Sequence, residues 1–435
     1  MSNLRAAVIG AGLAGSEAAY QLAKRGINVD LYEMRPQKLT PAHTGGGFAE
    51  LVCSNSLRSD RLENAAGLLK AELREMDSLI MRCAEDARVP AGGALAVDRV
   101  HFSALVKERL LAYDNVRFIN EEVVELPEEP VIIAAGPLCS DALVDTIQRL
   151  TGEEYCHFFD AAAPIVTKDS LNFDTVFSAS RYGRGEDDYL NCPMDEEQYH
   201  RFVDELVHAE TAPVHGFEGQ VFEGCMPVEV MAARGTETLA YGPLKPVGIV
   251  DPKTGKMPYA VVQLRRDDAA DTLYNIVGFQ THLKFGEQKR VFSMIPGLEN
   301  CEIVRYGVMH RNTYICSPKL LDHTYALRAN PLVAFAGQIT GVEGYIESTA
   351  SGFVAGVSMA QRLMDKPITD FTDLTATGAL GHYVCAGSGR DFQPMNVNFG
   401  IIQPPETRIK GGKLARYAYV AQRALNKIKE IKETI

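Results

Sequence analysis

The chain lacks an uncharged apolar run long enough to cross a membrane. Its nine cysteines are scattered singly, with no Cys-x-x-Cys pair and no Cys/His cluster at zinc-ligand spacing. It also has no internal repeat and no low-complexity tract. An odd number of cysteines without a secretion signal is typical of reduced thiols. We therefore expect a cytoplasmic protein that binds neither a membrane nor a metal ion.

The composition is that of an ordinary soluble protein, but its charge is uneven. The 435 residues are 46% hydrophobic and 23% charged, which is enough for two or three domains. The net charge of −12 argues against general nucleic-acid binding, DNA included. Residues 407–435, however, carry a net +6, which leaves −18 for the rest. This basic tail is either a solvated terminal helix or a strip that binds phosphates. Its basic residues are Arg408, Lys410, Lys413, Arg416, Arg423, Lys427, Lys429 and Lys432.

The N-terminus has the pattern of a strand, a helix and a second strand. Residues 4–10 are apolar, residues 15–25 have helical spacing, and residues 27–34 alternate as a strand does. Such a βαβ unit predicts a parallel sheet. Between the first strand and the helix lies Gly-x-Gly-x-x-Gly, formed by Gly10, Gly12 and Gly15.

These glycines suit a dinucleotide. The first permits a tight turn, the second lets a pyrophosphate approach the backbone, and the third packs helix against strand. The start of the helix offers N–H groups to the phosphates. Glu33 closes the second strand, where a carboxylate can accept hydrogen bonds from ribose hydroxyls. The alternative is a glycine-rich turn that binds nothing.

Two later segments also end strands in small residues. Residues 131–137 end at Gly136-Pro137, and residues 335–356 contain Gly337 and a helix that starts near Gly344. A simple NAD enzyme needs only the first glycine turn, so these additions favour the longer FAD molecule, lying across the sheet edge. Close packing of helix on strand is the alternative for each segment.

We expect an α/β fold, with an FAD-binding Rossmann-like domain of parallel sheet that is interrupted by a mixed α+β insertion domain. The expected boundaries are 1–148 and 316–435 for the two parts of the FAD domain and 149–315 for the insertion. Residues 60–88 and 101–113 are predicted helices, and residues 116–126, 258–266 and 272–283 are predicted strands.

Several long motifs resemble one enzyme family. They are GAGLAGSEAAYQLAKRGINVDLYEMRP (10–36), FAELVCSNSLRS (48–59), PAGGALAVDR (90–99), FEGCMPVEVMAARG (222–235), RYGVMHRNT (305–313) and FAGQITGVEGYIESTASG (335–352). The family is the bacterial folate- and FAD-dependent tRNA (uracil-5-)-methyltransferases, TrmFO, and the similarity covers nearly the whole chain. The related GidA/MnmG flavoproteins, which modify the tRNA wobble uridine, have a C-terminal helical extension that this chain lacks.

The resemblance implies a reaction and its cofactors. Bound FAD is reduced by NAD(P)H, 5,10-methylenetetrahydrofolate supplies one carbon, and a uridine in the T-loop of tRNA becomes 5-methyluridine. The expected partners are thus tRNA and folate. The expected cofactor-binding residues are Gly10, Ala11, Gly12, Leu13, Ala14, Gly15, Glu33, Arg35, Gly136, Gly337, Gln338 and Gly344.

Two cysteines are the predicted catalytic residues. Carbon 5 of uracil becomes nucleophilic when a thiolate adds at carbon 6, so the reaction needs a thiol. Cys225 is assigned this attack, and Cys53 is placed beside the flavin, as acid/base or as guard of the intermediate. The reverse assignment stays open. Arg58 and Arg61 lie close to Cys53 in sequence and are expected to favour its thiolate.

Weaker candidates are His282, Lys284, His310 and Arg311, which are expected to bind the pterin, the folate tail or RNA phosphate, unless they bond only to neighbouring groups. Two other functions remain open: an NAD(P)H–flavin oxidoreductase acting on a small metabolite, and a tRNA-binding flavoprotein that folds RNA without methyl transfer.

Overall fold

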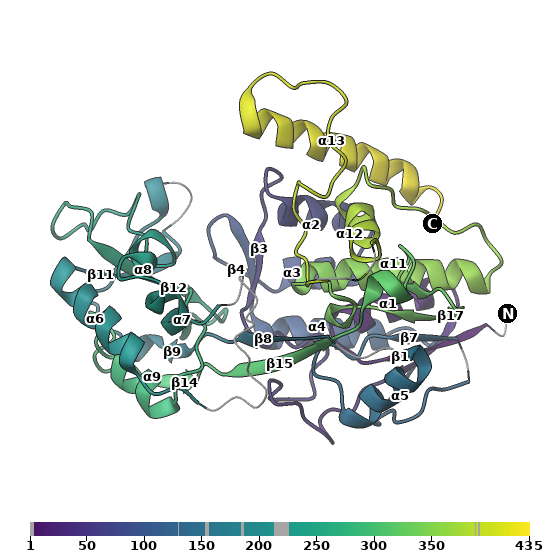
Figure 1. The fold of residues 1–435 in the computed structure, drawn as a ribbon, viewed down its shortest axis with the longest axis horizontal. Coiled ribbons are helices and arrows are strands. Elements are labelled where there is room, and N and C mark those ends of the chain that lie inside the picture. Colours follow the sequence, from purple (N-terminus) through teal and green to yellow (C-terminus); the bar gives the residue numbers. More distant parts are fainter. Residues whose placement is uncertain are drawn as a thin grey trace.

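A six-stranded sheet combines strands from both ends of the chain (Figure 1). Our computed structural model describes residues 4–128, 130–152, 156–183, 187–212, 226–387, 389 and 392–435. The sheet has the order β16-β17-β7-β1-β2-β6, and all neighbours are parallel except β16 and β17. The predicted parallel sheet is therefore confirmed. Its strands are β1 (Arg5–Ile9), β2 (Asn28–Tyr32), β6 (Val116–Ile119), β7 (Val131–Ile133), β16 (Ala326–Leu327) and β17 (Asn330–Phe335).

Two helices cross at very short range over this sheet. Helices α1 (Leu13–Lys24) and α11 (Tyr345–Leu363) are nearly all buried. A Cβ atom on Gly352 would lie 2.1 Å from the carbonyl oxygen of Ala14, and one on Gly356 would lie 2.8 Å from that of Ala18. The glycine spacing of α11 thus serves helix packing, which was one of the two interpretations of that motif.

The segment after β2 adds a small sheet and further helices. The sheet has the order β3-β5-β4, and the helices cover the same core as α1 and α11. The elements are β3 (Ser56–Ser59), α2 (Ala65–Glu75), α3 (Leu79–Asp86), β4 (Arg88–Val89), β5 (Ala94–Val97), α4 (Arg99–Leu111) and α5 (Asp141–Thr151). The helix predicted over residues 60–88 is two helices, because Asp77 has a positive φ of 62° and Ser78 caps α3.

The middle of the chain forms a second, antiparallel sheet with its own hydrophobic core (Figure 1). The order is β10-β11-β12-β13-β9-β14. Its strands are β9 (Ile165–Thr167), β10 (Phe177–Ser178), β11 (Tyr189–Met194), β12 (Ala260–Arg266), β13 (Leu273–Ile276) and β14 (Ile303–Arg305). The helices beside it are α6 (Glu196–His208), α7 (Val228–Ala233), α8 (Thr238–Tyr241) and α9 (Phe285–Phe292).

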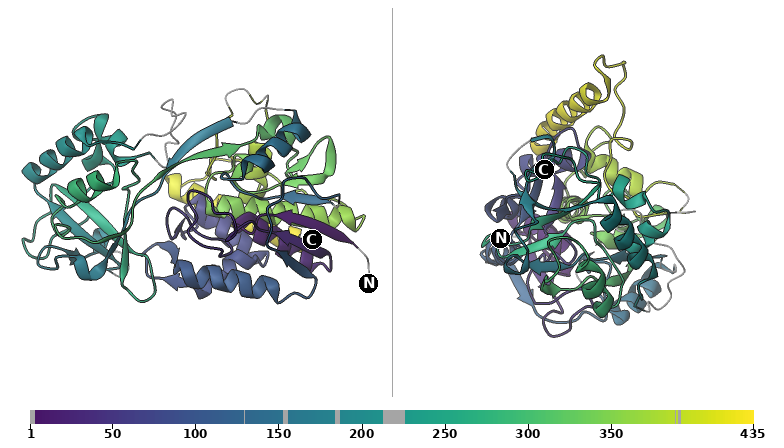
Figure 2. Two further views of the ribbon diagram at one scale, coloured as in Figure 1. Left: turned by 90° about the horizontal axis from the view of Figure 1, so that it is seen from below. Right: turned by 90° about the vertical axis from the view of Figure 1, so that its left-hand side faces the viewer.

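The chain enters and leaves this insertion through two paired strands. β8 (Cys156–Ala161) and β15 (Met309–Tyr314) are antiparallel and run between the two lobes (Figure 2). The expected interruption of the first domain is thus present, and the boundaries 148/149 and 315/316 stay a prediction. The predicted strands over 116–126 and 272–283 are too long, since they end at Ile119 and Ile276.

The C-terminal part returns to the first lobe. It contains α10 (Ser317–Leu320), α12 (Ala376–Val384) and α13 (Gly412–Lys432). The buried carboxylate of Glu72 in α2 accepts hydrogen bonds from the N–H groups of Ala376 and Thr377 and so caps α12. Helix α13, the basic tail, lies across α2 (Figure 1). Across the described part of the chain, no helix is both long enough and apolar enough to span a bilayer.

Candidate functional site

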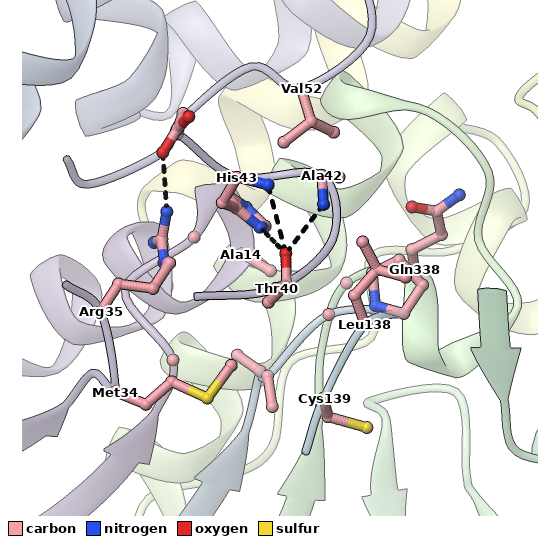
Figure 3. Close-up of a pocket in the computed structure, with 18 of the residues that line it drawn as sticks. Ala14, Met34, Arg35, Thr40, Ala42, His43, Val52, Leu138, Cys139 and Gln338 are labelled. Carbon is pink, nitrogen blue, oxygen red and sulfur yellow. Dashed lines mark hydrogen bonds and ion pairs between the residues drawn. The ribbon is translucent and has the colours of Figure 1, made fainter. Parts of the chain in front are cut away.

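A cleft of about 1240 Å³, including space open to solvent, lies where β1, β2, β7 and β17 end. Ligands of open α/β sheets bind at this edge. Figure 3 shows side chains that line it, among them Ala14, Arg35 and Gln338. Of the predicted residues, the lining includes Gly10, Gly12, Leu13, Ala14, Glu33, Arg35, Cys53, Gly136, Gly337 and Gln338. Ala11, Gly15 and Gly344 are not part of the described lining.

The three glycines of the first turn have different neighbours. A Cβ on Gly10 would lie 2.5 Å from the carbonyl oxygen of Ala134, and one on Gly15 would lie 1.8 Å from that of Gly10. A Cβ on Gly12 would meet no described atom within 4 Å. Helix α1 begins at Leu13 and has no side-chain cap from a described residue. The turn thus offers open space and helix N–H groups on the cleft side, as a pyrophosphate requires.

Glu33 joins the glycine turn to the end of β2. Its Oε2 accepts hydrogen bonds from the Ala11 N–H and from Arg35 Nη2, both at 2.9 Å. Its Oε1 accepts from the Arg35 N–H and Nε at 3.0 and 2.9 Å. Burial alone would raise the pKa of Glu33, but the hydrogen bonds and charge of Arg35 outweigh it, so this pKa lies below its usual value. Arg35 also contacts Glu50 at 3.1 Å. The ribose role of Glu33 stays a prediction.

The later glycine segments contribute unequally. A Cβ on Gly136, whose φ is +72°, would meet no described atom within 4 Å, so the backbone is open here too. Gln338 Nε2 donates to Glu343. Gly344 directly precedes α11, where a Cβ would lie 2.4 Å from Oε2 of Glu347. Its proximity to that carboxylate explains the glycine, and its predicted cofactor role is untested.

Cys53 lies half-buried at the cleft, in the loop 51–55, which we term the Cys53 loop. Its Sγ lies 3.8 Å from the carbonyl oxygen of Ala161. The N–H groups of Cys53 and Ser54 donate to the hydroxyl of Tyr345, at 2.8 and 3.3 Å. Tyr345 is buried, which raises its pKa well above 10, so it keeps its proton at neutral pH. The first turn of α11 therefore fixes the position of the thiol.

Arginines distant in sequence hold the carbonyl oxygens of the same loop. Arg99 donates to the carbonyl oxygens of Leu51 and Cys53, and Arg305 donates to that of Val52. Arg99 in turn pairs with Asp267 at 3.0 Å. Burial lowers the pKa of Arg305.

A third arginine, Arg265 of β12, holds the end of the Cys53 loop. It donates to Ser54 Oγ at 2.6 Å and to Asn55 Oδ1 at 3.2 Å. Both lobes thus contribute to this loop, and nothing in the local sequence around Cys53 indicated these residues.

The expected role of Arg58 and Arg61 beside the thiol is not supported by the contacts. Arg58 pairs with the buried carboxylate of Glu347, because its backbone has a positive φ of 64° and lies near the start of α11. The Arg61 guanidinium lies against Gly93, and the residue is exposed. Proximity in sequence did not predict proximity in space.

The other candidates fall at the edge of the insertion. Cys225 lies outside the described residues, as do the side chains of His310 and Arg311. The Nδ1 atom of His282 lies 2.5 Å from Oε1 of Glu229, and both side chains are nearly buried. Lys284 pairs with the exposed Glu210.

The basic tail is a helix with two kinds of cation. Toward its C-terminus, Lys432 pairs with Glu75 and Lys427 with Glu430. Near its start, the ring of Tyr417 stacks on that of Phe399 at 4.0 Å, and the cations of Lys413 and Arg416 lie 5.4 and 5.3 Å from the Tyr417 ring. This end of α13 joins basic and aromatic groups on an exposed surface, the combination typical of nucleic-acid contacts.

Comparison with known proteins gives a consistent result. Residues 5–367 match the family GIDA, glucose inhibited division protein A. A protein of Listeria monocytogenes serotype 4b, named methylenetetrahydrofolate--tRNA-(uracil-5-)-methyltransferase TrmFO, is 59% identical over 98% of this chain and 99% of its own length. A protein of the same name from Bacillus cytotoxicus is 60% identical over 97% of each chain.

Among solved structures, Aquifex aeolicus GidA superposes with a TM-score of 0.69, covering 99% of this chain and 74% of that one. At 14% identity this match shows the fold alone.

The Glu33–Arg35 contact predicts a pH-dependent stability. Because the folded pKa is lowered, the contribution is present above the unfolded value of about 4.3 and lost as the pH falls through the folded pKa. Glu33→Gln should lower the free energy of unfolding by about 3 kcal/mol at pH 7, and the difference should vanish in acid. Urea unfolding at several pH values measures this.

Glu122→Gln is the matched control, since Glu122 lines the same cleft and pairs with the exposed Lys38. It should change stability by less than about 1 kcal/mol. Equal losses in the two variants at pH 7 would contradict the role given to Glu33.

Proposed function

The chain belongs to the TrmFO family and to the wider GIDA family, and we propose that it methylates carbon 5 of the T-loop uridine in tRNA. Its substrates are methylenetetrahydrofolate and NAD(P)H, and its cofactor is FAD. The observation that carries the proposal is the single cleft that joins the glycine turn to Cys53, in a chain 59% identical to relatives of that name. It acts on tRNA in the cytoplasm.

The residues present suit FAD. The backbone is open at Gly12 and Gly136, and the start of α1 faces the cleft with its first N–H groups. From there the cleft continues to Ala161, Ala162 and Tyr345 beside Cys53. Gly12, Leu13 and Ala14 would hold the pyrophosphate, and Gly337 and Gln338 would lie at the isoalloxazine end. Bound FAD supplies the hydride that a reductive methylation requires.

The thiols supply what the uracil ring lacks. A thiolate that adds at carbon 6 makes carbon 5 nucleophilic, and a base must remove the carbon-5 proton before the thiolate leaves. We assign the attack to Cys225 and a role beside the flavin to Cys53. The Tyr345 hydroxyl fixes the Cys53 backbone by accepting two N–H groups, so the sulfur has a defined position at the cleft. A flavin oxidoreductase for a small metabolite would not need a thiol held in this way.

The first prediction on function concerns these cysteines. Purified protein with unmodified tRNA, methylenetetrahydrofolate and NAD(P)H should form 5-methyluridine. Cys53→Ala and Cys225→Ala should each reduce the product to a small fraction. Cys139→Ala is the matched control, because Cys139 lines the same cleft while burial raises its pKa to about 12 and keeps it a thiol. Nucleoside analysis of the tRNA by mass spectrometry is the measurement.

RNA that carries 5-fluorouracil separates the two roles. Fluorine cannot leave as a cation, so the adduct at carbon 6 should persist through denaturation in wild type and in Cys139→Ala, and be absent in Cys225→Ala. Peptide mapping identifies the sulfur. A bond at Cys53 would reverse the assignment, and full activity of Cys53→Ala would exclude a catalytic role for that residue.

The glycine turn gives a prediction for FAD. Gly12→Ala should fold normally, because its Cβ meets no described atom, but the methyl group should stand where the pyrophosphate approaches. Gly15→Ala should be unstable whether or not FAD is present, since its Cβ would lie 1.8 Å from a carbonyl oxygen. Wild type should be yellow, and Gly12→Ala should bind FAD at least about tenfold more weakly. Equal FAD affinity of wild type and a folded Gly12→Ala would place the pyrophosphate elsewhere.

The start of α13 gives a prediction for tRNA. Neutralising Lys413 and Arg416 as Lys413→Gln/Arg416→Gln should weaken tRNA binding, and the slope of log affinity against log salt should fall by roughly 1 for each phosphate that no longer has a cation beside it. NAD(P)H oxidation should not change. The control Lys24→Gln/Arg149→Gln removes two cations that pair with Asp77 and Glu125. If both variants bind tRNA as wild type does, α13 is a solvated helix that does not bind phosphate.

A further inference from the structure

Two histidines and two aspartates gather outside the cleft, at the surface of the C-terminal part. His323 lies between α10 and β16, Asp370 and Asp373 lie in the loop between α11 and α12, and His382 lies in α12. His382 Nε2 is 2.8 Å from Asp370 Oδ1, and His323 Nε2 is 4.0 Å from the same oxygen. None of these residues belongs to the described lining of the cleft.

The spacing suits one small cation. One ligand atom from each of His323, Asp370 and His382 lies within 4.8 Å of the other two. Zinc bonds to imidazole nitrogen and carboxylate oxygen are about 2.0–2.1 Å long, and tetrahedral angles therefore separate neighbouring ligand atoms by roughly 3.3 Å. The two distances of 2.8 and 4.0 Å to Asp370 lie on either side of this value. Small side-chain adjustments would bring all three atoms onto one ion.

The surrounding backbone holds the three segments together without a metal. A Cβ on Gly381 would lie 2.7 Å from the carbonyl oxygen of His323, so the glycine lets this segment approach α12 beside His382. The N–H of Thr372 donates to Asp370 Oδ1 at 2.8 Å and orients that carboxylate. The ligands would thus be arranged before an ion binds, which lowers the entropic cost of binding.

His382 also has the second partner that metal-bound histidines usually have. Its Nδ1 lies 3.6 Å from Asp373 Oδ1, on the side of the ring away from the Nε2–Asp370 contact. A carboxylate on the outer nitrogen fixes the tautomer that leaves Nε2 for the metal. The rings of His323 and His382 stack at 4.6 Å and 27°. Two protonated imidazoles at this distance would repel each other, whereas two neutral rings that share one cation would not.

We propose that His323, Asp370 and His382 bind one Zn²⁺ ion, with Asp373 orienting His382. The side chains are between a third and a half exposed, so water completes the tetrahedron. Imidazole and carboxylate ligands suit zinc better than Mg²⁺ or Ca²⁺, which prefer oxygen alone. The ion would join the turn before β16, the loop before α12 and α12 itself.

The test is a zinc titration of the full chain after treatment with a chelator, against a chromophoric competitor. Wild type should bind one Zn²⁺ per chain and melt at a higher temperature with zinc than without it. His323→Gln and His382→Gln should lose this site, and Asp373→Asn should bind about 10–100-fold more weakly. His208→Gln is the control, since His208 is exposed beside a single carboxylate, that of Asp204. It should bind as wild type does.

The same titration can overturn the proposal. Zinc binding that persists in His323→Gln or in His382→Gln, or that disappears in His208→Gln, would place the ion elsewhere. A wild type without stoichiometric zinc would exclude the site. Circular dichroism shows whether each variant is folded, and unchanged binding by a folded Asp373→Asn would remove the role of that carboxylate. Methylation is not a readout here, so the outcome is independent of the proposed function.

Discussion

The position of the Cys53 thiol depends on hydrogen bonds to the backbone on either side of it. Three successive carbonyl oxygens of the Cys53 loop accept from Arg99 and Arg305, and two successive N–H groups donate to Tyr345. These partners come from α4, β14 and α11, which belong to different lobes. Removing one guanidinium would leave buried carbonyl oxygens without a donor, a cost of roughly 1–3 kcal/mol each. The cleft therefore requires both lobes in place.

Much of the fold could be predicted because its signals are local. The glycine turn depends on backbone approach within a few residues, and Gly10 and Gly15 meet carbonyl oxygens of that region and of the neighbouring strand end. The alternation in residues 27–34 and the buried run at 131–133 reported their strands, because neighbouring residues in a strand share a local environment. Strand ends were less certain, since residues beyond Ile119 and Ile276 leave their sheets without a local signal.

The surroundings of the site could not be predicted in the same way. Arg99, Arg265 and Arg305 reach the Cys53 loop from 44 or more positions along the chain, whereas Arg58, five residues away, pairs with Glu347. Likewise, His323, Asp370 and His382 match no local ligand spacing, and the expectation that no metal binds was based on such spacing alone. Ion pairs and ligand sets of this kind depend on tertiary packing, which a single sequence does not report.

The paired strands β8 and β15 have a mechanical consequence. Because both connections to the insertion run side by side over six residues, they form a two-stranded ribbon and not two independent tethers. A hydrogen-bonded ribbon resists stretching and shear along its length but bends across its flat face. Relative motion of the lobes is thereby reduced to a hinge about one main axis. Such a bend would change the distance from Arg265 and Arg305 to the Cys53 loop, so the stiffness of this ribbon sets how precisely the thiol is held.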